Sequence, residues 1–197
     1  MKKCENLTER ERTEMARNVA EAFLAEPGVF AALSEPEAVK LFRIILDTCR
    51  EAGHLYTTGE RMEGVCVYWS KKERPGMLPQ LNMMWRMFRE LSFSTNLLLL
   101  RGQKHWTPTE KRYRKSPDFV EVFLLAVRKD AQGQGHFRKM LEEVFQVADA
   151  RNTVCVLDTD SRKKAEKYNH VGMHVVDCRA QKNGVIMFAM ERSGTRL

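Results

Sequence analysis

The feature that most constrains the fold is an apolar run followed directly by a glycine-rich turn and an amphipathic helix. Residues 120–127 are almost continuously apolar, which is typical of a central strand buried on both faces. The turn Gln132-Gly-Gln-Gly135 follows, and apolar residues from Phe137 to Ala148 then recur at helical spacing. Glycines let the backbone approach an anion, which the free N–H groups of the first helical turn can hold. The sequence therefore predicts a phosphate-binding strand–turn–helix unit.

The turn alone does not identify the phosphate compound. A P-loop needs Gly-Lys-Ser/Thr, which this turn lacks, and Arg138 stands where a dinucleotide fingerprint needs its third glycine. Gly-x-Gly turns also occur in plain strand-to-helix connections. Residues outside the turn are therefore needed to identify a bound phosphate compound.

The residues after this unit predict a strand, a short helix and a hairpin. Residues 153–157 are apolar enough for a strand, and Ser161 can cap a helix that Gly172 ends. Residues 175–178 and 185–190 flank Asn183-Gly184, a strong hairpin signal.

The first half of the chain predicts two helices, two strands and an insertion. Thr8-x-x-Glu11 and Ser34-x-x-Glu37 are capping boxes, each followed by apolar residues at helical spacing. Strand-like runs follow at 54–58 and 64–69. Residues 78–100 form an apolar helical region whose side chains are expected in the core or under a partner. Residues 101–117 lack periodicity and are expected to form a long loop. We expect one domain over 1–197, with a helical insertion at about 78–117.

The composition of the chain limits the kinds of binding partner that can be expected. The chain is 43% apolar and 30% charged, its apolar runs are too short to cross a bilayer, and its start lacks a signal-peptide core. A cytoplasmic protein without a membrane partner is expected. The formal charge of +7 suits nucleic acid or a polyphosphate cofactor, but no nucleic-acid-binding motif is present. Five scattered cysteines, and a histidine pair interrupted by Gly172, predict no metal site. The sequence does not predict an oligomeric state.

Two segments resemble the motifs of one family. Gln132, Gly133 and Gly135 match the acetyl-CoA signature of the GNAT (GCN5-related N-acetyltransferase) superfamily, although the bulky Phe137 replaces its last small residue. Residues 158–173 resemble the second motif, whose helix carries a tyrosine shortly before Gly-Phe. Tyr168 matches that tyrosine, Met173 replaces the Phe, and Lys164 stands where asparagine is frequent. Residues 22–27 and 64–69 also resemble a bacterial branch with a helical insertion before the central strand.

This resemblance implies a fold and a reaction. The fold class would be α/β (α+β), with a mixed, largely antiparallel central sheet flanked by helices and a C-terminal β-hairpin. The protein would be an N-acetyltransferase in which a primary amine, on a small molecule or a protein, attacks acetyl-CoA directly in a ternary complex.

The resemblance also assigns the cofactor site. Residues 121–127 would line the pantetheine, and a backbone N–H near Leu125 would polarise the thioester carbonyl. Residues 132–139 would hold the pyrophosphate, with Arg138 or Lys139 reaching the outer phosphates, while Phe137 is expected to point into the core. The assigned cofactor residues are Leu125, Ala126, Val127, Gln132, Gly133, Gln134, Gly135, His136, Phe137, Arg138, Lys139 and Lys164.

Two residues are assigned to proton transfer. Tyr168 would protonate the departing thiolate, because a phenol pKa near ~10 is close to that of a thiol; alternatively, its ring packs on the sheet. Glu121 would be the base, on the strand face of Phe123, Leu125 and Val127; alternatively, it is a solvated carboxylate or a contact for substrate charge. His105 and Asp118 are reserve bases.

A competing interpretation is a catalytically silent CoA-binding regulatory module. Phe137 argues for this interpretation and the intact Tyr168 argues against it.

Overall fold

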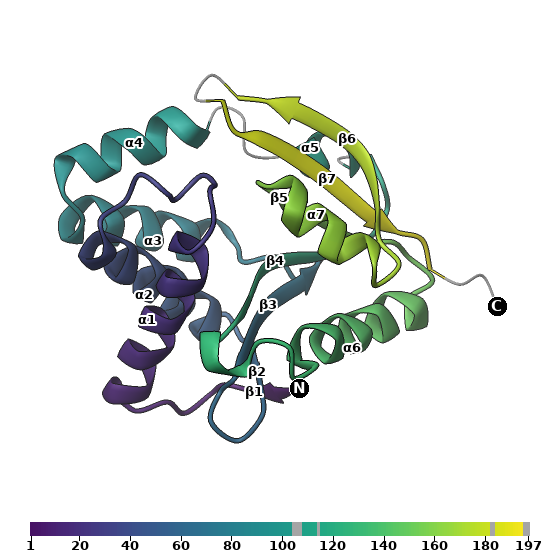
Figure 1. Cartoon of the computed structure of the whole chain (residues 1–197), viewed down its shortest axis with the longest axis horizontal. Coiled ribbons are helices and arrows are strands. Elements are labelled where there is room, and N and C mark those ends of the chain that lie inside the picture. Colours follow the sequence, from purple (N-terminus) through teal and green to yellow (C-terminus); the bar gives the residue numbers. More distant parts are fainter. Residues whose placement is uncertain (104–107, 114, 182–183, 195–197) are drawn as a thin grey trace.

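The computed structural model describes residues 1–103, 108–113, 115–181 and 184–194, and it is built on a seven-stranded sheet (Figure 1). The strand order is β1-β2-β3-β4-β5-β7-β6. The strands are β1 (Lys2–Lys3), β2 (Leu55–Thr58), β3 (Gly64–Ser70), β4 (Val120–Val127), β5 (Cys155–Thr159), β6 (His174–Ala180) and β7 (Ile186–Arg192). Neighbours pair antiparallel except β4 with β5, which pair parallel. The mixed, largely antiparallel sheet and the C-terminal hairpin are confirmed; Asn183 of the predicted turn lies outside the described residues.

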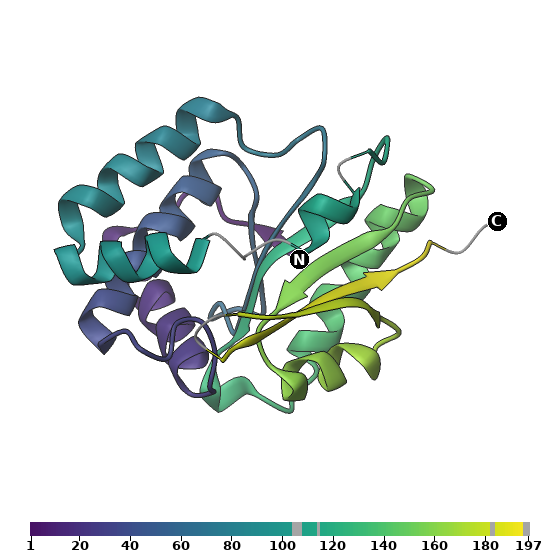
Figure 2. The same cartoon turned by 90° about the horizontal axis from the view of Figure 1, so that it is seen from above.

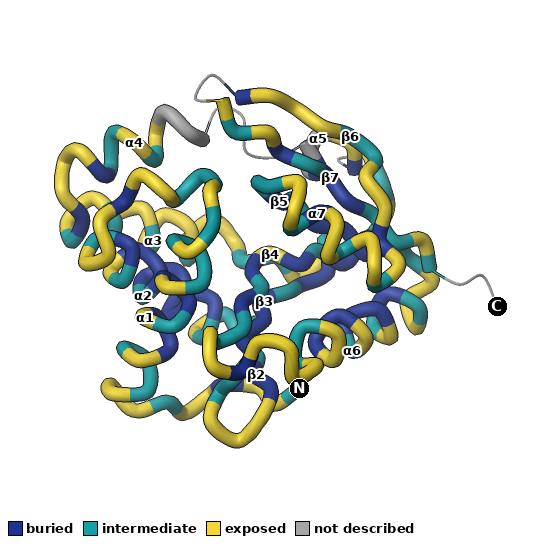
Figure 3. Tube along the Cα trace, in the orientation of Figure 1, coloured by how far each residue is buried: buried dark blue, intermediate teal, exposed yellow. Residues whose placement is uncertain are grey.

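Helices cover both faces of the sheet, as expected. α1 (Glu9–Leu24) and α2 (Glu35–Glu51) pack on one face with Val65, Val67 and Trp69 of β3. α5 (Pro108–Tyr113) lies on this same face farther along, where Tyr113 packs on Val156 of β5. We call this side the α1 face. α6 (His136–Ala150) and α7 (Arg162–Asn169) pack on the other side, the α6 face. Figure 3 shows buried residues concentrated in the central strands and along one side of α6.

The two predicted capping boxes differ in the structure. At Thr8 the box is complete, because the Glu11 N–H donates to the Thr8 hydroxyl at 3.3 Å and the Thr8 N–H donates to Glu11 at 2.7 Å. Ser34 caps α2 without a side-chain hydrogen bond, so that box is wrong. Glu37 instead accepts a hydrogen bond from the Ser92 N–H at 2.8 Å, which lowers the pKa of Glu37 to about 2. Glu37 thus ties α2 to Ser92, within the segment expected to be an insertion.

The segment expected to be a helical insertion contains two helices in place of one apolar region. α3 (Met77–Glu90) and α4 (Phe93–Gln103) lie with α1 and α2, away from α6 and α7 (Figure 2). Placing their apolar side chains in the core was wrong for most of them: α3 has no buried residue, and Phe88 and Phe93 are 74% and 79% exposed. Met83 and Met87 do pack against the core.

The predicted long loop at 101–117 is also corrected, since α4 extends to Gln103 and α5 occupies part of the remainder. A six-residue helix gains its stability from tertiary packing, here through Tyr113 and Thr109, and not from a periodic pattern. Among the described residues, no helix is long and apolar enough to cross a membrane.

Candidate active site

The site is organised by the point where β4 and β5 part. Both strands are fully described, and they pair at two positions, Val120 with Cys155 and Glu121 with Val156. Beyond Glu121 the two strands continue without pairing. β4 therefore has unpaired backbone groups on that edge.

The alternation of the β3–β4 ladder identifies those groups. The Arg128 N–H donates to the Glu63 carbonyl at 2.8 Å, so β4 residues two and four positions earlier also face β3. Leu125 and Val127 alternate with them, and their N–H and C=O groups point towards β5. These groups form a short row of donors and acceptors where the β4–β5 ladder has ended.

A β-bulge in β4 sets which side chains meet on each face. Val67 lies opposite Leu124 and Tyr68 opposite Val122, so Phe123 is an extra residue. The bulge exchanges the two faces: Val122 packs in the α6-face core, whereas Leu124 packs in the α1-face core.

Because of the bulge, the predicted face of Glu121 is wrong. Leu125 and Val127 pack on the α6 face, but Glu121 pairs with Trp69 and lies on the α1 face with it. Simple alternation had placed all three on one face. The Glu121 carboxylate accepts a hydrogen bond from the Trp69 indole N–H at 2.9 Å.

The glycine turn lies at the end of β4 and leads into α6. Gly133 and Gly135 have φ of +80° and +85°, a left-handed conformation that favours glycine, and a Cβ at either position would meet no atom within 4 Å. Space above the turn is therefore open. Gln132 and Gln134 bond back to the carbonyls of Val127 and Asp130, at 3.4 and 2.9 Å.

The start of α6 presents free amides to this space. The Lys139 N–H begins the helical bonding by donating to the Gly135 carbonyl at 3.0 Å, so the first-turn amides before it lie at the positive end of the helix. The Arg138 side chain is 63% exposed and lies 3.9 Å from Glu142. The Lys139 side chain is exposed as well.

His136 and Phe137 turn away from the open space. A His136 ring nitrogen lies 3.0 Å from the Thr58 hydroxyl, which docks the helix start on β2. Phe137 packs against the α6-face core and its ring centroid lies 5.2 Å from that of Tyr168. The expectation that Phe137 points into the core is confirmed.

Tyr168 lies on α7 and is half-buried against the α6-face core. Burial raises the pKa of its hydroxyl above the ordinary value, so the phenol is protonated at neutral pH. Its ring packs as the alternative interpretation expected, and a protonated hydroxyl is the form that an acid requires.

Lys164 is engaged away from the glycine turn. Its ammonium contacts Asp160 at 2.7 Å and lies 5.2 Å from the Phe23 ring centroid. Asp160 also accepts a hydrogen bond from the Val29 N–H at 2.8 Å. These contacts tie the loop between α1 and α2 to the start of α7, and Lys164 would have to leave them to reach a phosphate.

Asp158, a half-buried residue that the sequence did not single out as a base, lies near Glu121 on the neighbouring strand. Asp158 is on the α1 side of β5 and accepts a hydrogen bond from the Thr109 hydroxyl of α5. Burial, together with the negative charge of Glu121, raises the pKa of Asp158 to about 7. Its place in the second motif was visible in the sequence, but its partners come from α5 and β4 and leave no local signal.

Of the two reserve bases, Asp118 does not join this site. The Asp118 carboxylate lies 3.3 Å from the Arg151 guanidinium and accepts the Phe119 N–H at 3.0 Å, before the paired start of β4. His105 lies outside the described residues. Within the described part of the chain, no group of three potential metal-binding side chains is found.

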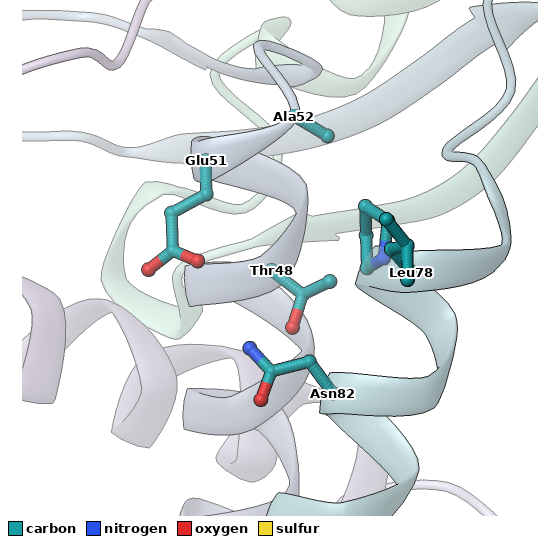
Figure 4. A pocket seen from close by; sticks show the side chains of 6 residues that line it. Thr48, Glu51, Ala52, Leu78 and Asn82 are labelled. Atoms are coloured by element: carbon teal, nitrogen blue, oxygen red, sulfur yellow. The ribbon is translucent and has the colours of Figure 1, made fainter.

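An open pocket of about 350 Å³ lies elsewhere, between α2 and α3 (Figure 4). Its lining residues are Thr48, Glu51, Ala52, Leu78, Pro79 and Asn82. None belongs to the parting of β4 and β5.

Comparison with known proteins gives a fold and no sequence match. No family model matches the chain, and no curated protein matches its sequence. A polyamine N-acetyltransferase from Drosophila melanogaster matches with a TM-score of 0.59 and 13% identity, over 96% of this chain and 98% of that one. An HPA2-related acetyltransferase from Corynebacterium glutamicum matches with a TM-score of 0.59 and 18% identity, over 97% of this chain and 95% of that one.

A third match is the C-terminal condensation domain of Ebony in complex with β-alanyl-dopamine, with a TM-score of 0.63 and 10% identity, over 95% of this chain and 96% of that one. These likenesses cover at least 95% of this chain but share few identical residues. The chain has the fold of the GNAT superfamily, as the two motifs implied.

Proposed function

We propose that this chain, with its GNAT fold, is an N-acetyltransferase that passes the acetyl group of acetyl-CoA to a primary amine in a ternary complex. The observation that supports this most is the parting of β4 from β5 beside the start of α6. Open space over two left-handed glycines suits a pyrophosphate, and the backbone groups of Leu125, together with the Val127 N–H, suit the amides of a pantetheine.

The proposed cofactor residues follow this line. The amides of Gly133 and of residues 135–138 hold the pyrophosphate, and the exposed Arg138 and Lys139 reach the outer phosphates. Ala126 is buried and its backbone groups face β3, so we propose that it only positions Leu125 and Val127 on either side of it. The Leu125 N–H stabilises negative charge that develops on the thioester carbonyl oxygen. Because Lys164 is held by Asp160, we propose only an indirect role for it.

Tyr168 is proposed as the acid. The amine attacks the carbonyl carbon, the C–S bond breaks, and the thiolate takes the Tyr168 proton from the α6 face. The amine arrives from the α1 face, where Glu121 lies, either as the base or as the negative charge that holds an ammonium group. Holding both reactants supplies much of the rate.

A panel of amines, scored by release of the CoA thiol from acetyl-CoA, tests the proposal. We expect turnover of at least one aliphatic amine, and a fall of about 10²–10⁴-fold for Tyr168→Phe, with cofactor affinity nearly unchanged. The Drosophila neighbour is described as forming N-acetylagmatine, so agmatine and polyamines belong on the panel.

The controls separate the alternatives. Turnover within a few-fold of the parent in Tyr168→Phe would leave the tyrosine a packing role only. Saturable binding of acetyl-CoA with no turnover of any amine would instead support the silent regulatory module. The Ebony domain shares the fold and is described in complex with β-alanyl-dopamine, so failure with acetyl-CoA calls for other acyl donors.

A further inference from the structure

The two carboxyl groups of the α1 face lie on the strands that part, next to the bulge of β4. Glu121 is the last β4 residue paired with β5, opposite Val156. Asp158 comes two residues later on β5, on the same face, and would lie opposite Phe123 if the ladder continued. Phe123 is the bulged residue, so Asp158 lies across the separation from the point where β4 changes face.

From this juxtaposition we propose that Asp158 takes the proton from the incoming amine, while Glu121 is the fixed negative charge that holds its ammonium form. This assignment rests on the acetyl transfer proposed above. It divides between two residues the roles that Glu121 alone could have filled.

The hydrogen-bond partners support this division. Glu121 accepts from the indole N–H of Trp69, whose side chain is buried. An indole can only donate, so it favours the carboxylate anion. Asp158 is bonded to the Thr109 hydroxyl, which can donate to the anion and, after rotation, accept from the protonated acid. Asp158 therefore has a suitable partner in both protonation states.

Among the side chains that the structure describes, the charges that act on Asp158 come from two strands. Glu121 on β4 raises the pKa of Asp158, and Arg179 on β6 lowers it, although this guanidinium is already paired with Asp177 at 2.8 Å. The neighbouring β7 residue, Ala189, brings no charge, and α5 contributes the Thr109 hydroxyl. The resulting pKa of about 7 is suited to accepting a proton at neutral pH.

The proton balance is complete with these groups. The ammonium gives one proton to Asp158, and the neutral nitrogen attacks the thioester carbon. As the C–S bond breaks, the thiolate takes the Tyr168 proton, and the second proton lost by nitrogen restores Tyr168. Asp158 then releases its proton to solvent, so one proton is released for each acetyl group transferred.

The arrangement identifies the acceptor as a cationic aliphatic amine. Two carboxyl groups near the attacking nitrogen favour a protonated amine, whereas an arylamine is already neutral at neutral pH and needs no base to attack. Loss of a base should therefore slow the acetylation of the aliphatic amine more than that of the arylamine.

The test measures kcat/KM against pH for the parent, Asp158→Asn and Glu121→Gln, with one aliphatic amine and one arylamine. For the aliphatic amine, kcat/KM of the parent should rise with pH through an apparent pKa near 7. In Asp158→Asn, kcat/KM should be lower by about 10²–10⁴-fold at neutral pH and should recover at higher pH, where the amine loses its own proton. Its rate with the arylamine should stay within a few-fold of the parent. Glu51→Gln, at an exposed carboxylate of α2, is the matched control.

Glu121→Gln should give a different signature. Loss of its negative charge moves the rising limb to lower pH and raises KM for the aliphatic amine. Parent-like profiles in a folded Asp158→Asn protein would overturn the assignment while leaving acetyl transfer intact. A Glu121→Gln profile that recovers only at high pH would return the base role to Glu121. A parent that binds acetyl-CoA but acetylates no amine would remove both proposals.

Discussion

At the scale of single residues, Asp158 carries a cost in stability. Its pKa is raised from 3.8 to about 7, because burial and the Glu121 charge disfavour its anion. Between these two pH values the folded protein keeps a proton that the unfolded chain has lost. Stability contributed by this group is thus highest below pH ~4 and falls as pH rises to about 7. The full difference corresponds to at most about 4 kcal/mol.

Asp158→Asn should therefore stabilise the protein at alkaline pH. The amide keeps an oxygen for the Thr109 hydroxyl but cannot ionise. We expect the urea midpoint to rise relative to the parent at about pH 8 and to change little at about pH 4.5. Glu51→Gln should show no such difference. A variant less stable than the parent at the higher pH would show that the Asp158 anion is held by favourable contacts, against the cause given for its raised pKa.

Two other residues show what a motif match can and cannot predict. The core-facing direction of Phe137 followed from its place in the apolar stripe of α6, and the structure confirms it. Lys164 was assigned by its motif position alone. Its partner Asp160 is only four residues earlier in the sequence. Phe23, however, belongs to α1, and no local sequence pattern predicts its contact with Lys164.

At the scale of elements, the strand–turn–helix unit was readable because its signals are local. Continuous apolar character predicted β4, the glycines predicted the turn, and helical spacing predicted α6. The bulge at Phe123 was not readable, since it depends on the register of β4 against β3. That register decides the face of Glu121, so the sequence could name the carboxylate but not its neighbours. α5 was missed for a related reason: its packing partners are distant in sequence.

The glycine turn leads to a prediction about cofactor binding. Acetyl-CoA at ~100 times its dissociation constant should add about 2.7 kcal/mol of stability, a rise in Tm of roughly 5–11 °C for a chain of this size. Gly135→Glu puts a negative side chain into the open space over the turn, where the phosphates are proposed to lie. The rise in Tm should vanish in this variant.

Backbone strain needs its own control, because Gly135 has a positive φ. Gly184 has a similar φ of +83° and equally open surroundings, but it lies in the β6–β7 connection. Both Gly→Glu variants should lose about 1–2 kcal/mol from the left-handed conformation, yet Gly184→Glu should keep the parent's response to acetyl-CoA. An undiminished response in a folded Gly135→Glu protein would place the cofactor elsewhere.

At the scale of the whole molecule, the sheet separates the two sides of the proposed reaction. Tyr168, Leu125 and Val127 lie on the α6 face, whereas Glu121 and Asp158 lie on the α1 face. The β4–β5 ladder ends after Glu121, between the two faces. In the proposed reaction an acid for the leaving thiolate and a base for the attacking amine act from opposite sides of this parting, without competing for the same proton.

Contacts between its first and last thirds also hold the chain together. Asp160 accepts from the Val29 N–H and pairs with Lys164, and Glu26 lies 3.2 Å from both Lys163 and Lys167. The loop between α1 and α2 is thereby held to α7, which carries Tyr168. Asp160 is the buried member of this set, with its side chain 10% exposed.

Asp160→Asn should therefore weaken the attachment of that loop. The amide can still accept from Val29, but the charge-assisted bond to Lys164 is lost, which should cost about 1.5–3 kcal/mol of unfolding free energy. Hydrogen exchange should accelerate at Val29 and its neighbours in the loop, while the amides of β3 and β4 keep their protection relative to global unfolding. Asp177→Asn removes an exposed ion pair with Arg179 and should cost at most about 1 kcal/mol with no change at Val29. Equal stability and equal exchange in the two variants would mean that the loop is held by the packing of Phe23 and Phe30 on α2 and not by Asp160.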